Sequence, residues 1–158
     1  MFGEYCINMQ ERREKVVDCG NAVIFLVVCD DEYLLELRPD NEKGFSNEVI
    51  IPGGKCQPDE GYAEALLREV EEETGLTDVK PIPLGDAFRA ITPSAYLYHM
   101  RAYLISIKDK SLVTNKNVEA GRHIWLNFNE AKLINWAHSQ LTLERAEKFL
   151  IEEELRKG

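Results

Sequence analysis

The chain has 158 residues, of which 44% are hydrophobic and 30% are charged, an ordinary globular balance that suits one domain with a sizeable core. Its formal net charge of −9 argues against broad attraction to nucleic acid duplexes or to anionic membranes. An anionic substrate would therefore need metal ions or a local basic patch.

The cysteines and the longest apolar run bear on the cellular compartment. Cys6, Cys19, Cys29 and Cys56 are scattered without a C-x-x-C pair, which favours reduced thiols over disulfides or a zinc site. No basic and then apolar leader is evident, and the run Ala22–Cys29 is far too short to span a bilayer. We therefore expect a cytoplasmic protein, and no partner for Cys56 can be read from the sequence.

The first part of the chain reads as a polar arm followed by strands. Residues 1–15 are mixed in charge and predict a loosely attached arm or an extra edge strand. Apolar segments bounded by turn residues predict three strands: Val16–Cys29, Tyr33–Leu37 and Glu48–Ile51. The continuous apolar run in the first of these is typical of a strand buried on both faces. Because Pro52 lacks an N–H group and Gly53 and Gly54 permit positive φ, the third strand should end and turn there.

The second part of the chain predicts more strands and a final helix. The expected strands are Leu84–Phe88, Tyr96–Ile107 and His123–Leu126. Asn127–Ile134 reads as a small helical segment and Leu141–Lys157 as a longer helix. Its inner face is expected to carry Leu143, Ala146, Phe149, Leu150 and Leu155. No repeat or linker is visible, so residues 1–158 are taken as a single domain of the α/β class, with helices on both sides of a mixed sheet.

The most informative stretch runs from Gly53 to Leu76 and predicts a helix over Gly61–Thr74, with Asp59 as its N-cap and Gly75 at its C-terminal end. Two stripes are expected side by side on this helix. The apolar stripe consists of Ala63, Leu66, Leu67, Val70 and Thr74. The acidic stripe consists of Glu69, Glu72 and Glu73, whose i, i+3, i+4 spacing places them on one helix face.

Three neighbouring carboxylates repel each other and should weaken the helix, but a hard divalent cation would reverse that penalty. A solvated acidic face is the alternative explanation for an isolated Glu-rich helix. Here the pattern is larger, and it reads Gly54-x5-Glu60-x7-Arg68-Glu69-Val70-x-Glu72-Glu73-x-Gly75-Leu76. This pattern resembles the Nudix box of the Nudix hydrolase family, with every specified position matched.

The resemblance implies an α/β/α sandwich and metal-dependent hydrolysis of the pyrophosphate in a nucleoside diphosphate linked to another moiety. It also implies Mg²⁺ or Mn²⁺ as cofactor. The implied metal ligands are the backbone carbonyl of Gly53 and the carboxylates of Glu69, Glu72 and Glu73. Arg68 is implied as an orienting residue, and a surface ion pair with Glu64 or Glu72 is the alternative. For Glu60, support of the ligands and capping of the helix both stay open.

Further site residues are expected outside the box. Glu119 is the candidate for an additional catalytic carboxylate, as metal ligand or general base, and Glu69 could position the water instead. The candidates for substrate binding are Arg38, Phe88, Arg89 and Arg101, with ordinary strand and core roles as the alternative. The position of Pro93 resembles the ADP-ribose pyrophosphatase subgroup.

Several functions follow, in order of preference. ADP-ribose or another NDP-sugar is the first expected substrate, and a house-cleaning enzyme that cleaves (d)NTPs is the alternative. A nucleotide-sensing module without catalysis is the rival from another class, although it would be expected to have damaged box carboxylates. A purely structural calcium-binding helix lacks an EF-hand loop. Many relatives dimerise, so a homodimer also stays open.

Overall fold

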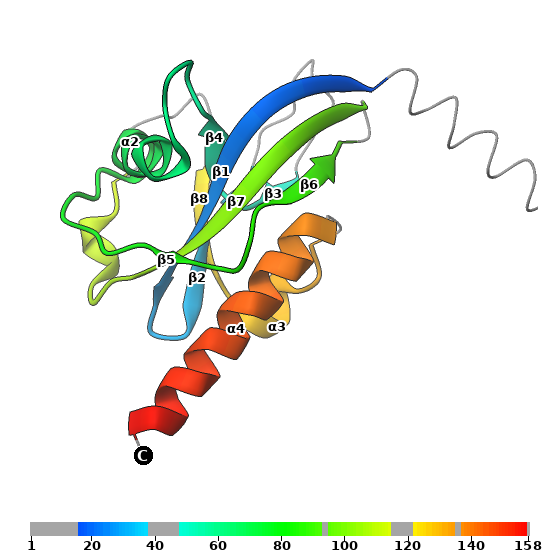
Figure 1. Ribbon diagram of the computed structural model, residues 1–158. Coiled ribbons are helices and arrows are strands. Elements are labelled where there is room, and N and C mark those ends of the chain that lie inside the picture. Colours follow the sequence, from blue (N-terminus) through cyan, green and yellow to red (C-terminus); the bar gives the residue numbers. More distant parts are fainter. Residues whose placement is uncertain (1–15, 38–47, 93–94, 115–121, 135–136, 158) are drawn as a thin grey trace, which may run out of the picture.

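The computed structural model describes residues 16–37, 48–92, 95–114, 122–134 and 137–157. The strands of these residues form one eight-stranded sheet, with α2 on one face and α3 and α4 on the other (Figure 1). The predicted α/β/α sandwich with a mixed sheet is confirmed.

The elements follow the predicted order with few exceptions. They are β1 (Val17–Cys29), β2 (Glu32–Leu37), β3 (Val49–Ile50), β4 (Gly53–Lys55), α2 (Tyr62–Thr74), β5 (Ile82–Pro83), β6 (Phe88–Ile91), β7 (Tyr96–Ser106), the short 3₁₀ turn η1 (Lys110–Leu112), β8 (Arg122–Asn127), α3 (Phe128–Ala131) and α4 (Ala137–Lys157). The sheet has the order β3-β2-β1-β7-β5, with β4 paired to β1, β6 to β7 and β8 to β2. The central pair β1 and β7 is parallel, and the other pairs are antiparallel.

The core is built around β1, whose residues Ala22–Cys29 are all buried, as the continuous apolar run predicts. Successive side chains of a strand point to opposite faces. Ile24, Leu26 and Val28 therefore join the cluster beneath α4, with Leu143 and Ala146. The cluster beneath α2 takes the alternate residues Val23, Phe25 and Val27.

Each helix turns a slightly different face to the sheet than the sequence predicts. On α2 the buried residues are Ala65, Leu66, Val70, Glu73 and Thr74. The prediction that Ala63 and Leu67 are buried is wrong, since Ala63 is exposed and Leu67 is 49% exposed. On α4, Leu155 is 75% exposed, because the end of this helix extends past the sheet (Figure 1).

The boundaries of some elements also differ. Of the predicted strand Leu84–Phe88, only Phe88 lies in a strand, β6; the rest connects β5 to β6, and Gly85 there has a positive φ of 78° that interrupts an extended strand. The last helix begins at Ala137 rather than at Leu141. Gly61, not Asp59, is the N-cap of α2, and it makes no side-chain cap hydrogen bond. Gly75 ends α2 in the left-handed conformation, as predicted.

Cys19, Cys29 and Cys56 are free cysteines in the described part of the chain, and Cys6 lies outside it. Within the described ranges, no helix has the length and apolar character that a membrane crossing needs.

Candidate functional site

The two box glycines lie in β4 beside β1. The third strand, β3, ends before Pro52 as predicted, but the turn predicted at Gly53 and Gly54 is wrong, because both pair with β1 as Ile24↔Gly53 and Val23↔Gly54. Neither glycine has a positive φ. Glycine is needed here for close approach: a Cβ on Gly53 would lie 2.1 Å from the Val23 carbonyl oxygen, and one on Gly54 would lie 2.2 Å from Glu69 Oε1. The Glu69 carboxylate therefore rests against the backbone of β4.

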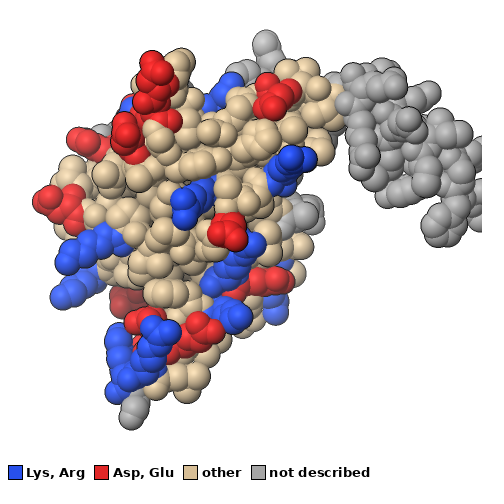
Figure 2. Space-filling view, viewed as in Figure 1, with Lys and Arg blue, Asp and Glu red and all other residues tan. Residues whose placement is uncertain are grey.

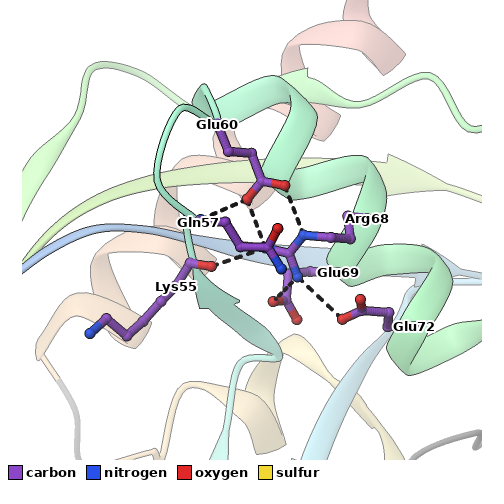
Figure 3. A network of polar contacts seen from close by, with 6 residues as sticks. All are labelled: Lys55, Gln57, Glu60, Arg68, Glu69 and Glu72. Atoms are coloured by element: carbon purple, nitrogen blue, oxygen red, sulfur yellow. Dashed lines mark hydrogen bonds and ion pairs between the residues drawn. The ribbon is translucent and has the colours of Figure 1, made fainter.

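Arg68 connects the loop before α2 to the carboxylates of α2 (Figure 3). Its Nε and Nη2 donate to the two carboxylate oxygens of Glu60, each at 2.8 Å. Nη2 also donates to the Lys55 carbonyl oxygen at 3.0 Å. On the other side, Nη1 donates to Glu69 Oε1 at 2.8 Å and to Glu72 Oε2 at 3.3 Å. The planar guanidinium is thus held at one end and holds two carboxylates at the other.

Glu60 anchors this arrangement from the loop. Its Oε1 accepts a hydrogen bond from the Gln57 backbone N–H at 2.8 Å as well as the one from Arg68. The ion pair with Arg68 and the Gln57 N–H together lower the pKa of the Glu60 carboxyl to about 2. Of the two expectations for Glu60, the contacts match support of Arg68 rather than capping of α2, whose N-cap has no side-chain bond.

The three carboxylates of the acidic stripe differ in environment. The Glu69 side chain is 12% exposed, and burial raises its pKa despite the neighbouring Arg68. The Glu72 side chain is 56% exposed, whereas Glu73 is buried, with only 8% of its surface exposed. Acidic side chains gather over the region of α2 in Figure 2, while basic and acidic groups mix elsewhere on the face in view. Two of the three carboxylates in the acidic stripe, Glu69 and Glu73, are therefore largely shielded from solvent.

The donor chemistry of this site suits a hard divalent cation. Glu69, Glu72, Glu73 and the Gly53 carbonyl offer oxygen ligands, and the absent Cβ of Gly54 lets Glu69 lie close to β4. Among the residues that the structure describes, no group of three or more His, Cys, Asp or Glu side chains is arranged to hold a metal ion. Arg68 donates to the carboxylates of both Glu69 and Glu72, and the Glu72 side chain is exposed.

The other expected site residues are scattered. Glu119 and Arg38 lie outside the described residues, as does Pro93. Phe88 packs against the cluster beneath α4, with the Arg145 guanidinium 5.9 Å from its ring centroid. Arg89 is exposed on β6. These residues are not brought together with the box carboxylates by any contact in the described part of the chain.

Arg101 lies on the same side of the sheet as α2, but two strands away from Gly54. It pairs with Val23 on β1, and Val23 pairs in turn with Gly54. Its guanidinium lies 5.9 Å from the Tyr103 ring centroid. Its role in substrate binding, like those of Arg38, Phe88 and Arg89, stays a prediction.

Sequence reasoning missed two parts of the site, the Lys55 carbonyl and the Gln57 backbone N–H. Both are backbone groups: every residue type supplies a carbonyl, and every type except proline supplies an N–H, so no letter in the sequence marks them. Cys56 lies between them, and burial raises the pKa of its thiol. We assign no function to Cys56.

Three comparisons with known proteins bear on the family. A family model described as the NUDIX domain matches residues 20–145. Nucleoside triphosphatase NudI of Salmonella agona is 34% identical over 84 residues, which cover 51% of this chain and 56% of that protein. The m7GpppN-mRNA hydrolase NUDT17 of Danio rerio is 39% identical over 66 residues, which cover 42% of this chain and 22% of that protein. The MutT NUDIX hydrolase from Burkholderia pseudomallei shares the fold with a TM-score of 0.67 at 18% identity, over 82% of this chain and 98% of that one.

Proposed function

We propose that this chain, which belongs to the NUDIX family, is a metal-dependent pyrophosphohydrolase whose substrate is a nucleoside triphosphate. The observation that carries the proposal is the complete box, in which Arg68 joins Glu60 to Glu69 and Glu72. A nucleotide-sensing module without catalysis does not need these carboxylates to be intact and held in place.

The order of substrates changes from the one that the sequence suggests. The preference for ADP-ribose or another NDP-sugar was based on Pro93, which lies outside the described residues. The NudI relative at 34% identity is named a nucleoside triphosphatase, and the chain spans about half the length of such relatives. We therefore place a (d)NTP of the house-cleaning type first and an NDP-sugar second.

A divalent cation such as Mg²⁺ or Mn²⁺ would neutralise the phosphate oxygens and acidify a bound water. Glu69, Glu72, Glu73 and the Gly53 carbonyl are the residues that would hold it. Burial raises the pKa of Glu69, so this carboxylate takes up a proton more readily than an exposed glutamate does. Glu119 stays the predicted general base, with Glu69 as the alternative.

Arg68 prepares the site before any ligand arrives. Its Nη1 donates to Glu69 and Glu72 and offsets the repulsion between their neighbouring charges. Glu60 and the Lys55 carbonyl hold the guanidinium from the loop side, so the rotation of Arg68 is restricted. Groups that orient ligands in this way contribute about 10–100-fold to metal affinity or activity in metal sites.

The test is product analysis on a panel of dNTPs, NTPs, ADP-ribose and other NDP-sugars with Mg²⁺ or Mn²⁺. A triphosphatase that cleaves as proposed releases nucleoside monophosphate and pyrophosphate. An NDP-sugar hydrolase releases monophosphate and a sugar phosphate instead, and that result would reverse our order of substrates.

The matched variant is Glu72→Gln, which removes one carboxylate from an exposed position and keeps the side-chain size. We expect its kcat to fall by about 100-fold, with its far-UV circular dichroism and melting temperature unchanged. Near-normal turnover in this variant would remove Glu72 from the metal site. Absence of turnover by the unmodified protein on the whole panel, with Mn²⁺ still bound in a titration, would favour the sensing module.

A further inference from the structure

The last turn of α2 carries two carboxylates of the acidic stripe and no apolar side chain. It consists of Glu71, Glu72, Glu73 and Thr74. Like charges on neighbouring positions repel each other, and acidic groups are unfavourable at the negative end of the helix dipole. The last carbonyl groups of a helix also have no partner within the helix, so helix ends fray readily. This turn therefore depends on hydrogen bonds, rather than on apolar packing, to stay helical.

Thr74 is the residue through which this turn is held locally. It is fully buried, and its Oγ1 donates to the Val70 carbonyl oxygen at 2.5 Å. The same Oγ1 accepts a hydrogen bond from the Leu76 backbone N–H at 3.2 Å. The Gly75 N–H donates to the Glu71 carbonyl oxygen at 2.9 Å. The chain is therefore fixed on both sides of Thr74.

A distant part of the chain supplies the partner of the Thr74 carbonyl group. The Thr114 backbone N–H donates to this oxygen at 2.8 Å, and the Thr114 hydroxyl donates to it at 3.3 Å. Thr114 is the last residue of the connection 107–114, which follows β7 and lies beside the C-terminal end of α2 (Figure 1). A carbonyl oxygen has two lone pairs, so these two donors satisfy the last carbonyl group of α2.

The connection 107–114 is itself anchored to the sheet. The Ile107 backbone N–H donates to the Val28 carbonyl oxygen at 3.0 Å, which continues the pairing of β7 with β1. Lys110, in η1, forms an ion pair with Glu32 at the start of β2. Thr114 therefore joins the last turn of α2 to a segment that the sheet holds at two other points.

We propose that Thr114 is a positioning residue of the metal site, which acts through Thr74 on the direction of Glu72 and Glu73. The inference rests on the proposed function, in which these two carboxylates help to hold a divalent cation. If the last turn unwinds, Glu72 and Glu73 leave the helix face that they share with Glu69. The hydrogen bonds from Thr114 oppose this unwinding, so they raise the population of the arrangement that binds the cation.

A titration with Mn²⁺, followed by the electron paramagnetic resonance signal of the free ion, tests the proposal without a substrate. Thr114→Val removes the hydroxyl and keeps the N–H, so the dissociation constant of Mn²⁺ should rise about threefold. Thr114→Pro removes both donors, and the dissociation constant should rise about tenfold or more. Thr114→Ser keeps both donors and should bind Mn²⁺ as the unmodified protein does.

Hydrogen exchange and two control variants separate positioning from a general loss of stability. The backbone amides of residues 71–76 should exchange faster in both weakened Thr114 variants, whereas those of residues 66–69 should not change. Leu143→Ala is the destabilised control, because its cavity lies beneath α4 and should leave Mn²⁺ affinity unchanged below the melting temperature. Leu112→Ala is the control within the connection, because Leu112 lies in η1 and is 55% exposed.

The proposal is overturned if the Mn²⁺ affinity of Thr114→Pro stays within about twofold of that of the unmodified protein. Thr114 would then have a structural role only, whatever the exchange rates of the last turn. If Thr114→Pro does not fold, unchanged Mn²⁺ affinity in Thr114→Val overturns the proposal instead. Equal losses of affinity in a Thr114 variant and in Leu143→Ala would also overturn it, because the effect would follow stability.

Failure of the proposed function gives a different result. An unmodified protein that binds Mn²⁺ but turns over no nucleotide is not the proposed enzyme, yet its titration still tests the role of Thr114. An unmodified protein that binds no Mn²⁺ would remove the metal site, and the positioning of Glu72 and Glu73 would be overturned with it.

Discussion

The two faces of the sheet are covered by helices that are held in different ways. Beneath α4 the contacts are mostly apolar, with Leu143 and Ala146 fully buried. Two partly buried hydrogen bonds add to them: the Tyr33 hydroxyl donates to Glu147 Oε1 at 2.6 Å, and Arg145 Nη1 donates to the Leu84 carbonyl oxygen at 3.0 Å. Beneath α2 the apolar contact is narrower, and the rim of the helix carries the Arg68 network.

The α4 face therefore contributes mainly to stability, and the rim of α2 contributes mainly to activity. The α4 face is built mainly from buried apolar side chains, so it contributes mainly to the free energy of unfolding. The α2 face places like charges side by side, which costs stability, and offsets them with Arg68. Substitutions beneath α4 should therefore change stability, and substitutions at the rim of α2 should change activity.

The largest expected effect is that of Leu143→Ala on the α4 face. Leu143 is fully buried, so the substitution leaves a cavity and should lower the free energy of unfolding by about 2–5 kcal/mol. Urea denaturation measures this value, and kcat measured below the melting temperature should not change. Leu155→Ala on the same helix is the control, because Leu155 is 75% exposed and the change should stay within about 0.5 kcal/mol.

The next effect is that of Gly54→Ala at the rim of α2. The added Cβ would lie 2.2 Å from Glu69 Oε1, so the carboxylate must move away from β4. We expect kcat to fall by about 10–100-fold, which steady-state kinetics with Mg²⁺ would measure. In Gly61→Ala the new Cβ lies 3.7 Å from the nearest atom, Glu64 Oε1, so this control should keep its activity. Equal losses in the two variants would contradict the role of close approach at Gly54.

The smallest effect is a change in the pH dependence of stability with Glu60→Gln. The pKa of Glu60 is lowered from 4.5 to about 2 in the folded protein, so the unfolded chain binds the proton more readily. The stabilisation is fully present above pH 4.5 and is lost as the pH falls toward 2. Melting temperatures of the two proteins should therefore differ most near neutral pH and converge in acid. A constant difference at every pH would show that the effect of the substitution is not ionic.

Much of the fold follows from local pattern. The apolar run Ala22–Cys29 predicts a strand buried on both faces, because only such a strand needs no polar side, and β1 is that strand. The spacing of Glu69, Glu72 and Glu73 predicts that the three residues share one side of α2, and Gly75 predicts where the helix ends. These features depend on helix and strand geometry alone, which the sequence carries in its periodicity.

The partners of each side chain were decided by the tertiary structure. Arg68 could have paired with Glu64 or Glu72 along the helix, but the loop before α2 brings Glu60 and the Lys55 carbonyl to it. Leu67 is exposed because the position of β1 and β4 beneath α2 selects a neighbouring stripe for burial. Gly54 is needed because Glu69 comes from another element to fill the place of its Cβ. Periodicity determines which residues share a side, but only the packing of elements far apart in the chain determines what that side meets.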